Sequence, residues 1–312
     1  MRIFPNANYN IVGAQKYAFW FSAIILAIGL VSLAFRGVAT GIDFRGGTEL
    51  VIETSQPVST VDVREALEPV LEDAPEVKEF GGPTQLLMRT AAVGDVTELS
   101  NRVISTLNEQ FPEANARVVL TDTVGPRFAD DLKRSAVLSV LFGLLVVFIY
   151  VMVRFEWTYS VGAVVALAHD VLFTLGMFSL LNGIVPFSLQ VDQTIVAAFL
   201  TLIGFSLNDT VIVFDRMREY TTLFKNERFD NIVNRATNAM LGRTMITNGS
   251  VLLTILVLFL FGGDVIRPFA FALLLGMSIG TYSSVFIAAP IVLVLRERLQ
   301  NKGRRTTVPA RA

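Results

Sequence analysis

The spacing of apolar residues divides the chain into six long hydrophobic stretches and one polar insertion. A helix that crosses a hydrocarbon core of about 30 Å needs roughly 17–25 residues that are mostly apolar. Backbone exposed to lipid must also satisfy its hydrogen bonds internally, as a helix does. The pattern therefore predicts six transmembrane helices, at residues 17–35, 135–153, 159–181, 194–214, 245–261 and 268–295.

The polar insertion, residues 37–131, contains helix-like and strand-like stretches that are shorter than a membrane span, as in a small folded domain. Some stretches follow a capping residue and place apolar residues on one helical face, and others are short and apolar like strands. The helix-like stretches are 59–72 and 95–111, and the strand-like stretches are 49–54, 77–80, 85–89 and 116–121. Their order, strand, helix, two strands, helix and strand, predicts a ferredoxin-like α/β domain.

Lysine and arginine in the connections predict the orientation in the membrane. Residues 215–243 carry six of these cations and the chain after Leu295 carries six more, whereas residues 182–193 carry none. The N-terminus (1–16), the loop 215–243 and the tail 296–312 are therefore expected in the cytoplasm. The insertion, with 17 acidic and 7 basic residues, is expected outside. We interpret residues 17–35 as a retained helix, because the apolar run is long for a cleaved signal peptide.

The predicted fold class is thus a polytopic α-helical membrane protein with six transmembrane helices and a ferredoxin-like α/β extracytoplasmic domain between the first two. The composition agrees, since 53% of the residues are apolar and only 17% are charged. There is no cysteine, which excludes disulfides and thiolate metal sites. The insertion also lacks a histidine and a nucleophile motif, so we expect no enzymatic site, cofactor, metal ion or nucleic-acid partner.

Asp209 is the most informative single residue, because it lies within an otherwise apolar predicted span. A carboxyl group there costs a few kcal/mol on insertion scales, and such residues usually face a helix-bundle interior or carry protons. Asp209 lies about 22 Å along its span, in the cytoplasmic third. Arg243 begins the next apolar stretch from the cytoplasmic side, so it is the candidate partner. The alternatives are a structural ion pair for Asp209 and a snorkelling anchor for Arg243.

Other polar residues lie within the predicted spans. His169, the single histidine of the chain, and Asp170 fall near the middle of the third span, which predicts a buried hydrogen-bonded network or a proton relay. Polar residues also recur at helical spacing in the fourth and fifth spans, which predicts a hydrated seam between them. These two stripes are Thr201, Asn208 and Asp215, and Arg243, Thr247, Ser250 and Thr254.

Glycines mark two further segments. Residues 276–280, GMSIG, have the small-xxx-small spacing that favours close packing of membrane helices. Residues 41–49, GIDFRGGTE, permit tight turns and close backbone approach. A phosphate-binding loop is the weaker interpretation of the second segment, because no helix start and no P-loop lysine follow it.

Four motifs together resemble the SecD/SecF family of protein translocase subunits. They are GIDFRGGTELV (41–51), ALAHD (166–170), LTLIGFSLNDTVIVFDRMRE (200–219) and GRTMITN (242–248). Their order and spacing, and the six spans with one large insertion after the first, are similar to the SecF branch of that family. The resemblance covers residue 42 to about residue 295.

The resemblance implies a function in protein export across the plasma (inner) membrane. A SecF-like chain pairs with SecD in a fold related to the resistance-nodulation-division exporters, and the pair uses the proton-motive force in late steps of export. The implied partners are SecD, the SecYEG channel with SecA, YajC, YidC, the translocating preprotein and membrane lipid. The family's proton-pathway residues fall on Asp209 and Arg243. From the sequence pattern itself we add His169, Asp170, Asn208, Asp215 and Thr247 as supporting intramembrane polar residues.

Two functions of other classes remain open from the residues. One is a proton-coupled small-molecule or lipid exporter of the resistance-nodulation-division type. The other is an intramembrane aspartyl protease that uses Asp170 and Asp209, although its two carboxyl groups would have to share one site.

Overall fold

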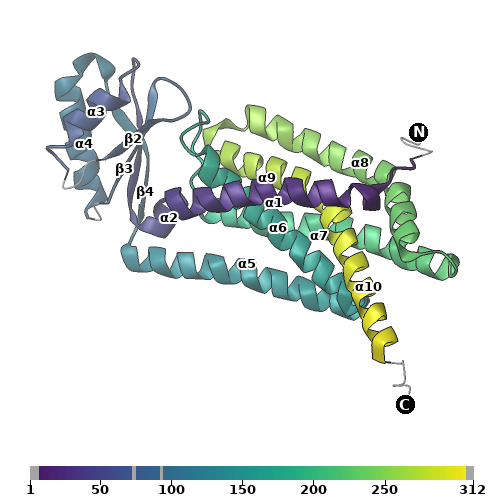
Figure 1. Ribbon diagram of the computed structural model, residues 1–312. Helices are drawn as coiled ribbons and strands as arrows, with labels where there is room; N and C mark the ends of the chain where they lie inside the picture. Colours follow the sequence, from purple (N-terminus) through teal and green to yellow (C-terminus); the bar gives the residue numbers. More distant parts are fainter. Residues whose placement is uncertain (1–6, 72–74, 92–93, 307–312) are drawn as a thin grey trace.

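The structure, a computed structural model, describes residues 7–71, 75–91 and 94–306 as a bundle of long helices with a small α/β domain at one end (Figure 1). Within these residues, six helical segments are long and apolar enough to cross a membrane, which confirms the predicted multi-pass class. Each predicted span lies inside one of them. The segments are α1 (Ile11–Arg36), α5 (Pro126–Arg154), α6 (Trp157–Leu181), α7 (Gln193–Leu223), α8 (Phe229–Phe261), and α9 (Gly263–Ser283) continued by the π-helical turn Ser284–Ala288 into α10 (Ala289–Thr306).

The predicted loop 215–243 is mostly helical, which corrects the sequence prediction. Helix α7 continues to Leu223 and α8 begins at Phe229, so only residues 224–228 connect them. These extensions carry charged residues but also bury apolar ones, among them Val233 and Ala236, which are fully buried. Hydropathy alone ends a span where charges begin, whereas a helix continues as long as one of its faces is packed.

The α/β domain has the predicted order of elements. Its strands are β1 (Gly47–Glu53), β2 (Glu76–Glu79), β3 (Gln85–Thr90) and β4 (Arg117–Val124), and its main helices are α3 (Thr60–Leu67) and α4 (Val96–Gln110). The sheet order is β2-β3-β1-β4 with every neighbouring pair antiparallel. Both helices pack on one face of the sheet, where Leu50, Ile52, Leu86, Met88, Val63, Leu67, Val103 and Leu107 form the core.

Helix α3 is shorter than predicted. It ends at Leu67 rather than near Glu72, which lies outside the described residues. Pro69 follows two residues later and has no N–H to donate to another helical turn.

A joint connects the α/β domain to the helical bundle, and it is formed by the glycine-rich segment 41–47. Gly46 and Gly47 have positive φ angles of 74° and 119°, which turn the chain from the short helix α2 (Ile42–Arg45) into β1. A Cβ on Gly47 would lie 2.5 Å from the carbonyl oxygen of Thr90, so only glycine fits there. The segment is therefore a structural turn, and a phosphate-binding function has no support in its geometry.

The same joint holds the N-terminal end of α7. Thr40 forms a parallel bridge with Val191, and Asp43 accepts a hydrogen bond from the backbone N–H of Gln193 at 3.0 Å. Asp192 caps α7 by accepting from Ile195 N–H at 2.9 Å. Burial raises the pKa of Asp192; the hydrogen bond from Ile195 opposes this increase and the nearby Asp43 carboxylate adds to it. The domain, α1 and α7 thus meet in one hydrogen-bonded unit.

Close contacts between small residues hold the helices together. Gly29 of α1 and Gly176 of α6 bring their backbones together, since a Cβ on Gly176 would lie 2.9 Å from the Cα of Gly29. Gly276 of α9 faces Leu202 of α7, and Gly280 faces Ser206. The predicted close packing of segment 276–280 is confirmed.

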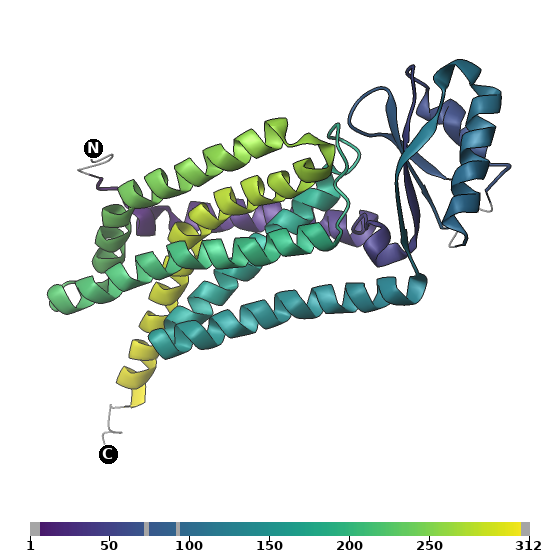
Figure 2. The same cartoon turned by 180° about the vertical axis from the view of Figure 1, so that it is seen from behind.

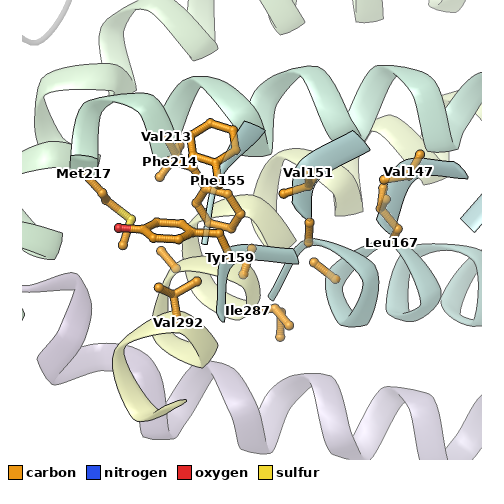
Figure 3. Close-up of a cluster of buried hydrophobic side chains, with 14 of the residues drawn as sticks. Val147, Val151, Phe155, Tyr159, Leu167, Val213, Phe214, Met217, Ile287 and Val292 are labelled. Carbon is orange, nitrogen blue, oxygen red and sulfur yellow. The ribbon is translucent and has the colours of Figure 1, made fainter. Parts of the chain in front are cut away.

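One cluster of the bundle core lies at the end away from the α/β domain. There the rings of Phe155, Tyr159 and Phe214 lie together (Figure 3), with Tyr159 and Phe214 edge to face at a centroid distance of 5.0 Å. Helix α1 begins and α10 ends at this same end of the molecule (Figures 1 and 2). The apolar core fixes α5, α6, α7 and α10 relative to one another.

We predict that residues 37–131, excised from the chain, unfold cooperatively, because the α/β domain has its own apolar core. The substitution Gly47→Ala in this fragment should lower the free energy of unfolding by about 1–3 kcal/mol, the cost of a strained backbone conformation. Urea unfolding followed by circular dichroism measures both.

The matched control is Gly94→Ala, since Gly94 has open space around it and no positive φ. This variant should stay within about 0.5 kcal/mol of the unsubstituted fragment. Equal effects of the two substitutions would contradict the role given to Gly47.

Candidate functional site

Asp209 lies inside the bundle and joins three helices. Its side chain is 3% exposed and accepts a hydrogen bond from the Nδ2 atom of Asn248 in α8. The same nitrogen donates to Oγ1 of Thr281 in α9 at 2.6 Å. We call Asp209, Asn248 and Thr281 the Asp209 cluster. One oxygen of the Asp209 carboxylate is thereby satisfied by one neutral donor, Asn248 of α8, which Thr281 of α9 also binds.

The expected contact between Asp209 and Arg243 is absent, which corrects the sequence prediction. Arg243 is exposed, and no ion pair is found for it among the described residues. Arg243 precedes Asn248 by five positions in α8. The two side chains are therefore about 140° apart around the helix axis and about 7.5 Å apart along it. The helix therefore points Asn248 at Asp209 and Arg243 elsewhere.

Arg243 instead lines a polar cavity of about 1320 Å³ at the end of the bundle away from the α/β domain. The segment before α1 forms one wall and is attached to α8. Tyr9 donates its N–H to Oδ1 of Asn238 at 2.8 Å, and its carbonyl accepts from Nδ2 of that residue at 2.8 Å. The N–H of Val12 donates to Oδ1 of Asn234 at 2.8 Å.

The two predicted polar stripes face outward rather than toward each other. Thr201 and Asn208 of α7 are exposed, as are Thr247, Ser250 and Thr254 of α8. Several of these hydroxyl groups donate to carbonyls of their own helix, for example Thr201 to Ala197 at 2.8 Å and Thr254 to Ser250 at 3.1 Å. Local bonds of this kind allow a hydroxyl to face an apolar surrounding. The buried polar face of α8 lies one residue further on, at Thr244 and Asn248.

Asp215 also lies outside the buried site. It pairs with Arg154 of α5 at 3.1 Å, and both side chains are about half exposed. Such an exposed pair contributes about 0–1 kcal/mol to stability.

The second buried carboxylate, Asp170, has partners on three helices. Its Oδ2 accepts from Ser206 of α7 at 2.7 Å and from Ser283 of α9 at 2.8 Å, and its Oδ1 lies 3.1 Å from Nδ1 of His169. Asp170 is fully buried and His169 is 6% exposed. We call these four residues the Asp170 cluster. The predicted buried hydrogen-bonded network around His169 and Asp170 is confirmed, whereas its part in a proton relay stays a prediction.

Two backbone features of α9 make room for this cluster. Gly280 packs against Ser206, and a Cβ there would lie 3.0 Å from the Ser206 side chain and 3.5 Å from Oδ2 of Asp170. A π-helical turn begins at Ser284, directly after Ser283. Such turns are rare and occur frequently at functional sites. Ser284 bonds Thr210 of α7 at 2.9 Å, so hydroxyl pairs continue along the α7–α9 contact.

The two clusters are neighbours but do not share a site. Ser206 precedes Asp209 by one helical turn in α7, and Thr281 precedes Ser283 by two residues in α9. Asp170 and Asp209 each have their own donors, however, and no hydrogen bond joins the two carboxylates in the described part of the chain. An aspartyl protease requires carboxyls that share one site, so this arrangement gives no support to that alternative.

The two clusters contain two carboxyl groups and one imidazole, which are titratable groups. Within the described residues, no group of three or more His, Asp or Glu side chains is close enough together to hold an ion. The residues that sequence reasoning missed are Ser206, Asn248, Thr281 and Ser283. Ser206 could have been found by its position one turn before Asp209, and Asn248 closes the GRTMITN motif.

Comparisons with known proteins agree on one family. The family described as "Protein export membrane protein SecD/SecF, C-terminal" matches residues 103–298, and the "SecD/SecF GG Motif" matches residues 31–58. The protein translocase subunit SecF of Rhodothermus marinus is 53% identical over 98% of this chain and 99% of its own length. That of Escherichia coli O157:H7 is 36% identical over 92% and 88%.

Two solved structures of SecDF are also similar. The SecDF of Thermus thermophilus, a translocon-associated membrane protein, matches with a TM-score of 0.82 and 32% identity over 95% of this chain. SecDF in its super-membrane-facing form matches with a TM-score of 0.71 and 31% identity over 97%. The chain spans only 40% of the length of each SecDF chain.

We predict that Gly280→Ala destabilises the bundle by about 1–3 kcal/mol, because the added methyl group presses on Ser206 beside Asp170. Denaturant unfolding of the purified chain in detergent micelles, followed by circular dichroism, measures the change. Gly204→Ala in α7 is the control, since nothing lies within 4 Å of its Cβ position. A loss of stability in the control as large as in Gly280→Ala would disprove the packing explanation.

Proposed function

The chain belongs to the SecF family of protein translocase subunits, and we propose that it acts as an accessory subunit of the Sec preprotein translocase. In this function it pairs with SecD and uses the proton-motive force to promote late steps of protein export across the plasma (inner) membrane. The observation that carries the proton-driven part of the proposal is the buried carboxyl group of Asp209, which accepts from Asn248 of α8, a residue that also binds Thr281 of α9.

Asp209 is suited to couple protons to helix movement. Taking up a proton removes the charge that Asn248 stabilises, so the contact between α7, α8 and α9 changes in strength. One charge that crosses 100 mV gains about 2.3 kcal/mol. A few protons are therefore enough to bias two arrangements whose free energies differ by a few kcal/mol.

The joint at the outer end of α7 gives this movement a route to the α/β domain. Asp43 and Val191 connect the start of α7 to the segment that enters β1. A shift of α7 would therefore move the domain, which we place outside the cytoplasm with both termini inside.

The exposed polar stripes support pairing with SecD. Asn208 on α7 and Thr247 on α8 are exposed on these stripes, and polar side chains that face lipid are unfavourable. We propose that SecD covers these stripes and that Arg243 takes part in the proton pathway at this contact. SecYEG with SecA, YajC, YidC and the translocating preprotein are the proposed further partners, with membrane lipid around the remaining faces.

We predict that Asp209→Asn abolishes the stimulation of export by a proton gradient, because the amide keeps the shape and the contact to Asn248 but binds no proton. The measurement is preprotein transport into inverted membrane vesicles with and without an imposed gradient. Asp215→Asn, which removes a carboxyl group from the half-exposed pair with Arg154, is the control and should retain the stimulation. Normal stimulation in Asp209→Asn, at normal protein levels, would rule out the proton-carrying role.

Arg243→Lys separates two roles of the arginine. If Arg243 only anchors α8 at the membrane surface, lysine replaces it fully, because it also snorkels and keeps the charge. A role in the pathway needs the planar guanidinium, which can bind a carboxylate through two hydrogen bonds. We predict that Arg243→Lys leaves pairing with SecD intact and impairs gradient-driven export, and that Arg243→Ala impairs it more. Full activity of the lysine variant in the same vesicle assay would leave only the anchor.

A further inference from the structure

The function proposed above uses Asp209, but the structure contains a second buried carboxylate beside the single histidine of the chain. We propose that His169 and Asp170 form a second proton-binding site, in series with Asp209 on the contact between α6, α7 and α9. This inference rests on the proposed proton-driven function. It adds a site to that function rather than another activity.

The first observation is the unequal bonding of the two nitrogen atoms of His169. Nδ1 lies 3.1 Å from Oδ1 of Asp170, whereas Nε2 is buried and has no hydrogen-bond partner among the described residues. The ring is 6% exposed and stacks near Phe173 at a centroid distance of 6.3 Å. A buried polar atom without a partner is unusual in a folded protein and calls for an explanation. Here it leaves one position of the imidazole open to a proton.

The second observation concerns the charge of the pair. With Nδ1–H donating to the Asp170 carboxylate, the pair carries one negative charge inside the membrane. One proton added at Nε2 makes the ring cationic next to the carboxylate, so the pair then has no net charge. Nδ1–H keeps its hydrogen bond throughout, and the proton leaves from the same nitrogen. Loading and unloading therefore require no change of partner at Asp170.

The other side chains that contact Asp170 are neutral hydroxyl groups, so the charge of Asp170 is offset by His169. On α7 the contact to Asp170 is the hydroxyl of Ser206, and on α9 it is the hydroxyl of Ser283, with Gly280 beside it. Among the described residues, His169 is the one titratable side chain that contacts Asp170. Asp209, one turn beyond Ser206, is the next carboxyl group on the α7 face.

Hydroxyl groups contact both sites. Ser206 of α7 donates to Asp170 and lies one turn before Asp209, and Ser283 of α9 donates to Asp170 two residues after Thr281, which accepts from Asn248. A hydroxyl group both donates and accepts, so it can pass a proton on. The π-helical turn after Ser283 marks the part of α9 where backbone hydrogen bonding is least regular. Movement of α9 would change contacts to both carboxylates together.

The composition of the chain permits a direct test, because His169 is its only histidine. The full chain is labelled with 15N-histidine, purified through a tag without histidine, and reconstituted in liposomes. Nitrogen NMR then reports the protonation of each ring nitrogen of one residue between about pH 5 and pH 8, the range in which histidine usually titrates. We expect Nδ1 to stay protonated over the whole range and Nε2 to gain a proton as the pH falls.

Variants distinguish a proton site from a structural hydrogen bond. In Asp170→Asn the carboxylate that offsets the ring charge is gone, so the protonated fraction at a given pH should fall at least about tenfold. Ser283→Ala removes one donor but neither titratable group, and should keep the titration of Nε2. An imidazole that stays neutral in the unsubstituted chain, or that titrates identically in Asp170→Asn, would overturn the proposal.

A transport measurement tests the coupling to Asp209. His169→Asn keeps a donor near the position of Nδ1 and removes Nε2, so we expect it to lose gradient-driven export. Normal gradient-driven export in this variant would refute the place of the pair in the pathway. The NMR titration needs no export, so it remains informative even if the proposed function of Asp209 fails.

Discussion

The central constraint of this structure is that two carboxyl groups inside a membrane bundle need hydrogen-bond donors from neighbouring helices. An unpaired charge in such a place is expensive, and no arginine or lysine contacts either group among the described residues. Asp170 is held by Ser206, Ser283 and His169, and Asp209 by Asn248. Neutral donors hold a carboxyl group in either protonation state, which a tight ion pair would not do as readily.

Close helix packing makes these contacts possible. Serine side chains are short, so they reach a carboxylate on another helix only where the backbones approach closely. Gly280 allows this approach between α9 and α7, and Gly29 with Gly176 allows it between α1 and α6. In lipid, where apolar surface provides little drive for association, such small-residue contacts are a main source of helix packing. The glycine contacts and the hydrogen bonds to the buried carboxylates therefore depend on each other.

The connection to the α/β domain also depends on glycines at positions where a side chain would clash. Gly46 and Gly47 turn the chain where a side chain would strike Pro126 or Thr90, and Asp43 reaches the first N–H group of α7. The helix that carries Asp209 is thereby attached at its N-terminal end to the domain. At the opposite end of the bundle, Asn238 and Asn234 attach Tyr9 and the first turn of α1 to α8. The first attachment holds α7, which carries Asp209, and the second holds α8, which carries Asn248.

The sequence by itself determined the six spans and the order of elements in the α/β domain, because both follow from local periodicity and length. It also identified Asp209, His169 and Asp170, since charged or titratable residues in apolar stretches are visible without a structure. The sequence could not determine the rotation of each helix about its axis. Two polar stripes of α8 have the same helical spacing, one at Thr247, Ser250 and Thr254 and one at Thr244 and Asn248. Only packing decides which of them faces inward. For that reason Asn248 rather than Arg243 is the partner of Asp209. Packing also decides that residues 215–243 are largely helix rather than loop, because apolar residues on one face of these extensions are buried.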